Sequence, residues 1–207
     1  NMRRAATGSS SQGNAALEEL NRAARNLEGA RASGTTRGVQ QLADKARELE
    51  ERQQQIQQGV QQLQESGASE RAQRLQQLNE QKDRLANDVR ALESEADRLA
   101  RSARRDQPKA AGQLSNAADA IREQRLADKI DFSKQVARSG STEYATAFEN
   151  QIGENLRDVS ERLRAARGAL QGESGSRAQE RTLERTRELV AGIESLRERV
   201  AQRAGQQ

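Results

Sequence analysis

Apolar residues recur along this chain at alternating intervals of three and four residues, in segments separated by short Gly/Ser-rich stretches. This spacing gathers apolar side chains on one stripe of an α-helix, and its sustained heptad form is typical of coiled coils. The most regular stripe comprises Leu75, Leu78, Lys82, Leu85, Val89, Leu92, Ala96, Leu99 and Ala103. The pattern therefore predicts an all-α protein built from long helices.

Gly/Ser clusters and the single Pro108 divide the periodic part into about six helices, because such residues mark helix ends. The expected helices span approximately 14–33, 36–63, 69–104, 109–138, 143–171 and 176–200. Gly34 is expected to end the first helix, and GESG at 172–175 is expected to form the last turn. Residues 1–13 have no periodicity and are expected to form a flexible tail.

In an antiparallel hairpin, the numbers of two facing residues add up to a constant, because one number rises as the other falls. The stripe residues of neighbouring helices pair in this way, which predicts that these helices fold back antiparallel. The second and third helices pair at a sum of 138, as in Val60 with Leu78. The fourth and fifth pair at 280, as in Phe132 with Phe148, and the fifth and sixth pair at 348 or 349. In the first register Gln53 and Lys82 fall in the apolar seam, where they either fix the register or extend to the surface.

The economical arrangement is an elongated bundle of two successive three-helix antiparallel units, residues 14–106 and 107–207, joined near Pro108. In length and topology each unit resembles a spectrin-type repeat, although the Trp residues of that family are missing. The likeness is one of architecture and implies no particular function.

Composition supports the helical interpretation and narrows the chemistry. Ala, Glu, Lys, Leu and Arg make up more than half of the chain, and the formal net charge is only +4 although 32% of residues are charged. The absence of Cys and His removes thiolate chemistry and the commonest metal ligand and neutral-pH acid–base group. No phosphate-loop, EF-hand or metalloprotease motif occurs. We therefore expect no enzyme activity, with no catalytic, cofactor-binding or metal-binding residue, and no transmembrane segment in this chain.

A basic cluster follows the most regular helix. It comprises Arg98, Arg101, Arg104, Arg105 and Lys109. Such residues can contact phosphates of nucleic acid or of an anionic membrane surface. The plainer interpretation, which we prefer, is that cations are favoured at a helix C-terminus, since no aromatic residue for base stacking lies nearby.

The three aromatic residues, Phe132, Tyr144 and Phe148, lie within 17 positions. The 280 register places Phe132 against Phe148, which predicts a packed hairpin tip. The same tip is a candidate surface for binding a partner protein.

Residues 126–156, together with LSNAADAIREQRL at 114–126, resemble helical coiled-coil regions of large uncharacterised bacterial envelope proteins. The resemblance is compositional and covers about 50 residues; it implies a bacterial origin and a soluble periplasmic or other extracytoplasmic region. We expect a non-enzymatic helical scaffold or protein-interaction module, a fragment of a larger bacterial protein, with a protein partner or self-association. The alternative is a basic helical module that binds nucleic acid or an anionic membrane surface.

Overall fold

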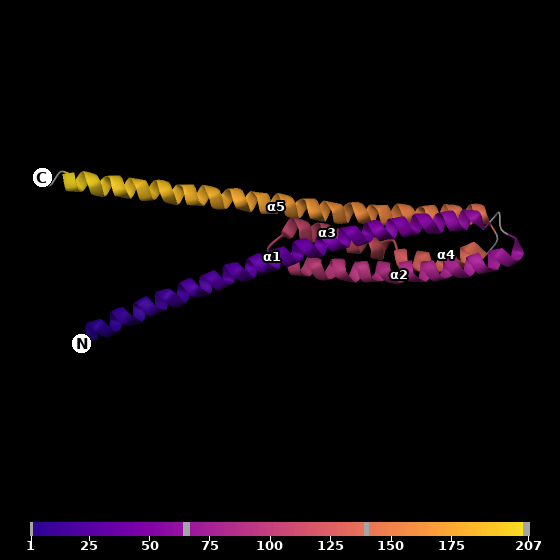
Figure 1. Ribbon diagram of the computed structural model, residues 1–207, viewed down its shortest axis with the longest axis horizontal. Coiled ribbons are helices and arrows are strands. Elements are labelled where there is room, and N and C mark those ends of the chain that lie inside the picture. The colour runs from indigo at the N-terminus through magenta and orange to yellow at the C-terminus, as the bar shows by residue number, and fades with distance from the viewer. Residues whose placement is uncertain (1, 64–66, 139–140, 205–207) are drawn as a thin grey trace.

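The fold is entirely α-helical over the residues that the computed structural model describes, which are 2–63, 67–138 and 141–204. Five helices follow one another along this part of the chain (Figure 1). They are α1 (Met2–Gln62), α2 (Ala68–Ala103), α3 (Pro108–Glu123), α4 (Leu126–Arg138) and α5 (Thr142–Ala204). The prediction of an all-α protein made of long helices is confirmed, with five helices in place of about six.

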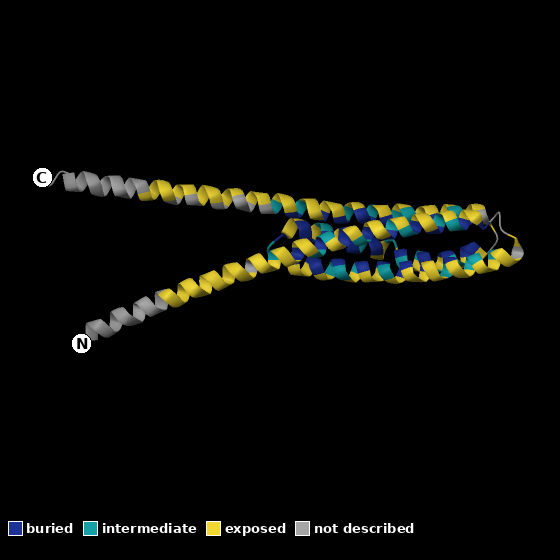
Figure 2. Ribbon diagram, viewed as in Figure 1, coloured by how far each residue is buried: buried dark blue, intermediate teal, exposed yellow. Residues whose placement is uncertain are grey.

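The helices form an elongated antiparallel bundle (Figure 1), and their contacts define four helical positions in cross-section. The C-terminal half of α1, all of α2 and the N-terminal half of α5 fill three positions, and α3 and α4 follow one another in the fourth. Each position packs against two neighbours: α1 against α2 and α5, and the α3–α4 pair against α2 and α5. Buried side chains form a single apolar core along the axis (Figure 2).

This single core differs from the predicted pair of three-helix units. Residues from both predicted units, such as Leu49 and Val159, belong to one buried cluster. The reason is that α5 packs against α1, so that the boundary near Pro108 is a turn within the bundle and separates no cores. Pro108 begins α3, where its missing N–H costs nothing.

The predicted registers of the two hairpins are confirmed. A Cβ on Gly38 would lie 2.9 Å from both δ-methyls of Leu99, and one on Gly59 would lie 2.7 Å from a δ-methyl of Leu78. Both pairs are within one residue of the 138 register, and at both points a Cβ on α1 would be too close to a leucine of α2. Phe132 of α4 meets Phe148 of α5 edge-on, with ring centroids 5.7 Å apart, as the 280 register requires.

Two long segments project from one end of the bundle. They are the N-terminal part of α1 before Thr35 and the C-terminal part of α5 after Leu170, and we call them the α1 arm and the α5 arm (Figures 1 and 2). The predicted helix ends at Gly34 and at 172–175 are wrong, because both helices continue through them. The predicted tail, residues 1–13, lies within α1 from Met2 onward. The predicted packing of the sixth helix against the fifth is also wrong, since both are parts of α5.

The hydroxyl groups near these glycines bond within the continuing helix. Ser33 and Thr36 donate to the carbonyl oxygens of Gly29 and Ala32, four residues earlier, so they do not cap a new helix. Ser176 donates to Gly172 in the same way. A glycine inside an exposed helix weakens it by about 1 kcal/mol relative to alanine but does not end it.

The predicted fourth helix is instead interrupted at Arg125. This residue has a φ of 49°, in the left-handed region that favours glycine. The amide of Arg125 donates to the carbonyl of Arg122, which closes the last turn of α3 before α4 begins at Leu126.

Candidate functional site

A polar layer crosses the apolar core, and each of the four helical positions contributes one residue to it. Gln53 comes from α1, Lys82 from α2, Ser133 from α4 and Glu149 from α5. All four are buried, with exposed fractions of 1%. Sequence reasoning placed Gln53 and Lys82 in the seam, and the alternative that Lys82 extends to the surface is wrong.

Glu149 is the centre of this layer. Its Oε1 accepts a hydrogen bond from Lys82 Nζ at 2.5 Å, and its Oε2 accepts one from Gln53 Nε2 at 2.8 Å. Lys82 Nζ also donates to the carbonyl oxygen of Ser133, at 3.3 Å. Gln53 and Gln57 both donate to the backbone carbonyl of Glu149 at 3.0 Å. The layer therefore ties all four helical positions together with directional bonds.

Burial sets the electrostatics of the layer. Removal from water lowers the pKa of Lys82 from its ordinary value, and the charge and hydrogen bond of Glu149 oppose that shift. A buried ion pair of this kind costs desolvation energy that its attraction roughly offsets, so its main effect is to penalise arrangements in which one charge loses its partner.

Of this layer, Gln53 lines a groove on the bundle surface. This groove, of about 190 Å³, lies between α1 and α5, and another open polar groove, of about 390 Å³, lies between α1 and α2. Neither is lined by Lys82 or Glu149. Among the described residues, no group of three acidic side chains is placed to hold a metal ion. In the same part of the chain, no helix is long and apolar enough to cross a membrane.

The candidate aromatic residues come together near the closed end of the bundle. Phe132 contacts Phe148, and Tyr144 lies tilted against Phe148 with ring centroids 6.3 Å apart. Phe132 and Tyr144 are 50% and 56% exposed, whereas Phe148 is only partly exposed. The predicted packing of this tip is confirmed, and two of its rings face solvent.

The basic cluster lies at the opposite end, at the turn between α2 and α3. Arg98 forms an ion pair with Glu95, whose hydrogen bond and charge raise the pKa of the guanidinium. Arg101, Arg104 and Arg105 are exposed, and no ion pair is recorded for them among the described residues. The backbone amide of Lys109 donates to Glu173 of α5. Of this cluster, Arg98 is paired with Glu95, whereas Arg101, Arg104 and Arg105 present exposed side chains at the turn.

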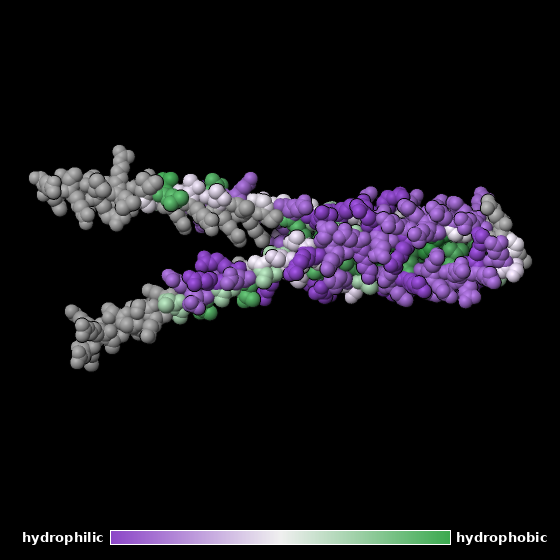
Figure 3. Space-filling view, in the orientation of Figure 1, coloured by the Kyte–Doolittle hydropathy of each residue, from purple (hydrophilic) through white to green (hydrophobic). Residues whose placement is uncertain are grey.

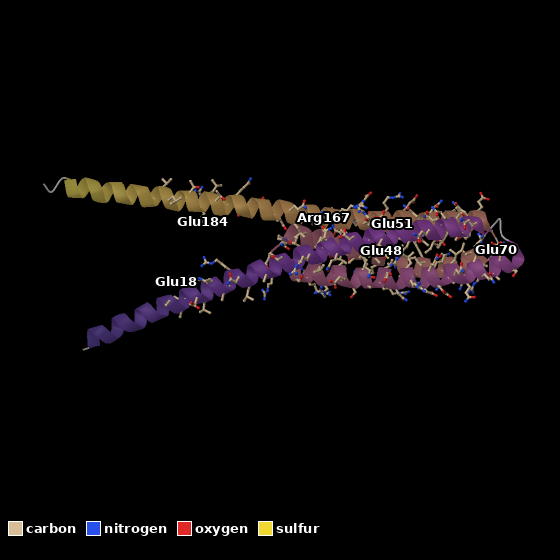
Figure 4. All side chains as sticks on the ribbon, in the orientation of Figure 1. Glu18, Glu48, Glu51, Glu70, Arg167 and Glu184 are labelled. Carbon is tan, nitrogen blue, oxygen red and sulfur yellow. The ribbon has the colours of Figure 1, made fainter. Side chains whose placement is uncertain are left out.

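The two arms carry the largest exposed aliphatic side chains. Leu17, Leu20 and Leu27 of the α1 arm are 59%, 66% and 60% exposed. Leu183, Leu189 and Val190 of the α5 arm are 58%, 68% and 50% exposed. Figure 3 shows hydrophobic atoms along both arms, whereas most of the visible bundle surface is hydrophilic. Charged side chains such as Glu18 and Glu184 also project from the arms (Figure 4).

Sequence reasoning missed Glu149 and the exposure of the arms. A signal for Glu149 existed, because it precedes the buried Leu156 by seven residues and so occupies a seam position. The leucines of the arms have the same spacing as core leucines, and spacing cannot distinguish a packed stripe from an unpacked one.

Comparisons with known proteins give no relative: no family model, no curated protein and no solved structure matches this chain.

Proposed function

We propose that this chain is a non-enzymatic helical scaffold that binds protein through its two arms. The observation that carries the proposal is the exposure of six aliphatic side chains on helices that project beyond the bundle. Covering such a stripe removes apolar surface from water and so favours binding. Packing against a partner would also stabilise the arms, because an isolated helix gains little stability from helix propensity alone. The bundle, fixed internally by its polar layer, holds the two arms at one end.

The amphipathic character of the arms supports a helical partner. On α1, Leu17, Leu20, Ala24 and Leu27 follow the spacing of three and four residues, and an apolar stripe of this kind packs into the face of another helix. The resemblance to coiled-coil regions of bacterial envelope proteins supports the further proposal that this scaffold is one region of a larger bacterial protein.

Site-specific photo-cross-linking in the native host tests this proposal. A photoreactive amino acid is placed singly at Leu20 and Leu183 on the arms and, as matched controls, at the exposed bundle positions Gln54 and Gln81. The proposal expects protein adducts from the arm positions and few from the controls. Adducts confined to the bundle positions, or equal at all four, contradict it.

The second candidate function is binding to an anionic surface. The observation that favours it is the exposed group Arg101, Arg104 and Arg105, at the bundle end from which the arms project. If it holds, binding to duplex DNA or to vesicles with anionic lipid weakens steeply with salt. Replacing Arg104 and Arg105 with serine then lowers the salt slope. Unchanged binding in this variant, or no binding at low salt, rejects this candidate.

A further inference from the structure

Within the bundle, the residues of α1 that face α2 repeat every seven residues. Gly38 lies against Leu99, Lys45 and Arg52 pair with Asp88, and Gly59 lies against Leu78. Extending this column backward by sevens reaches Arg31, Ala24 and Leu17. Leu17 and Ala24 therefore continue the column that lies against α2. Leu20 and Leu27 continue the neighbouring outer column, whose bundle members Gln41 and Glu48 are exposed.

The α5 arm follows the same rule on its other neighbour. Phe148 of α5 contacts Phe132 of α4, and steps of seven from Phe148 reach Leu183 and Val190. The adjoining column contains Asp158, which accepts a hydrogen bond from Gln124 at the end of α3. Leu183 and Val190 therefore continue the face that α3 and α4 cover in the bundle, whereas Leu189 continues a column whose bundle members Glu154 and Glu161 are exposed.

Both covering helices end where the arms begin. α2 ends at Ala103 and α3 begins at Pro108, so the turn between them closes two of the four helical positions at this end (Figure 1). Beyond it, the α1 and α5 arms continue alone, and the columns that contain Leu17 on α1 and Leu183 and Val190 on α5 each border one of the two vacated positions. Two further helices are needed to complete the four-helix cross-section.

We propose that the occupant is the pair of arms of a second copy of this chain, related by a twofold axis across the arms. A rotated copy supplies two helices at once, one for each vacated position. Its α1 arm then runs antiparallel to the first α1 arm, and its α5 arm runs antiparallel to the first α5 arm, which continues the all-antiparallel packing of the bundle. Such an interface uses the same surface on both copies and therefore closes after two chains.

The α1 arm is self-complementary in this arrangement. An antiparallel pair centred between Leu17 and Leu20 places Leu17 of each copy against Leu20 of the other. Ala16, Ala23 and Ala30 repeat every seven residues beside this stripe, and small residues let two helices approach closely. From Ala15 to Ala30 the charged residues lie outside the stripe. A single partner helix from another protein would cover only one of the two arms.

This inference rests on the proposed function, in which the arms are the interaction surfaces. Sedimentation equilibrium of the full chain from about 1 to 100 μM tests it directly. The variant with Leu17→Glu and Leu20→Glu buries four carboxylates in the proposed interface, and the dimer dissociation constant should rise by about a hundredfold. Leu183→Glu with Val190→Glu, on the other arm, should have the same effect.

The matched control is Asn26→Glu with Ser33→Glu, which adds the same charge to a column of the same arm whose bundle members Arg47 and Gln54 are exposed. It should leave the dimer intact, and circular dichroism should show the bundle folded in every variant. A wild-type chain that is monomeric at 100 μM overturns the inference. So does a dimer that the Leu17→Glu and Leu20→Glu variant leaves unchanged, or one that the control weakens equally.

Spin labels test the orientation, and the chain has no native cysteine to interfere. Labels on a cysteine introduced at Glu19, near the proposed axis, should give an intermolecular distance below about 40 Å, since packed helix axes are about 8–10 Å apart. Labels at Gly67, at the closed end of the bundle, should be out of range. Close Gly67 labels would indicate another interface and overturn the inference. Arm adducts to a different protein, with a monomeric chain, would reject the second copy while leaving the proposed function standing.

Discussion

Lys82 of α2 and Glu149 of α5 form an ion pair in the core of the bundle, with 1% and 2% of their side chains exposed. In every other ion pair among the described residues, at least one partner has more than a third of its side chain exposed. The pair links two helices that are far apart in the sequence, so it bears on the arrangement of the whole bundle.

Removing one partner of this pair should be far more costly than removing both. In Lys82→Leu, Glu149 loses its cation and becomes a buried charge without compensation, which should lower the free energy of unfolding by about 3–5 kcal/mol. From the 138 register alone, a leucine at this seam position is expected to stabilise the hairpin. The partner on α5 reverses that expectation.

The double variant Lys82→Met with Glu149→Met is the control. It replaces the pair with apolar side chains of similar volume and should recover the wild-type free energy of unfolding or exceed it. Chemical denaturation of both variants and of the wild type measures the effect. If the single and double variants are equally unstable, Lys82 and Glu149 are not energetically coupled.

The lowered pKa of Lys82 also predicts a pH dependence. Between its folded pKa and its unfolded value of 10.5, the unfolded chain holds a proton that the folded chain has released. Stability therefore rises with pH in that interval, because the unfolded state binds more protons. The difference in free energy of unfolding between the wild type and Lys82→Leu should grow as the pH is raised from 7 toward 10.5. A difference that shrinks over this range would mean that burial does not dominate at Lys82.

The close approach of α1 and α2 at Gly59 predicts a steric effect. Gly59→Leu forces a side chain into the space of Leu78 and should lower the free energy of unfolding by about 1–3 kcal/mol. The control is Gly112→Leu on α3, where no atom lies within 4 Å of the added Cβ. It should raise the free energy of unfolding by about 0.5–1 kcal/mol, through helix propensity.

Adding Leu78→Ala to Gly59→Leu should restore part of the loss, because the smaller side chain vacates the contact. Thermal and chemical unfolding of these three variants check the prediction. A Gly59→Leu variant as stable as Gly112→Leu would show that the helices are further apart at this point than the structure has them.

The helical class and the hairpin registers were predictable because they depend on spacing alone. A heptad stripe such as that around Leu85 fixes which face is buried, and a short loop forces the next helix to return antiparallel. The pairs Gly59–Leu78 and Phe132–Phe148 follow from those two facts. The Gln53 and Lys82 seam positions followed in the same way.

The division into two units and the partner of Lys82 were not predictable, because both depend on contacts between distant segments. Nothing local to α1 indicates that it packs against α5, and a short loop relates only successive helices. The helix ends predicted at Gly34 and at 172–175 were wrong for a different reason. Glycine next to serine or threonine favours a helix end, but here the hydroxyl groups donate to carbonyl groups of the preceding turn and cap no new helix.

The sequence does not signal the interruption at Arg125, since neither glycine nor proline occurs there. The left-handed backbone of Arg125 predicts the effect of placing a glycine at this position. A non-glycine residue in the left-handed region costs roughly 1–2 kcal/mol. Arg125→Gly removes this strain, and Arg125→Ala retains it, while both lose the same exposed pair with Asp128. The glycine variant should therefore exceed the alanine variant in free energy of unfolding by about 1 kcal/mol, as measured by urea denaturation. An alanine variant of equal or greater stability would indicate that α3 and α4 join into one continuous helix.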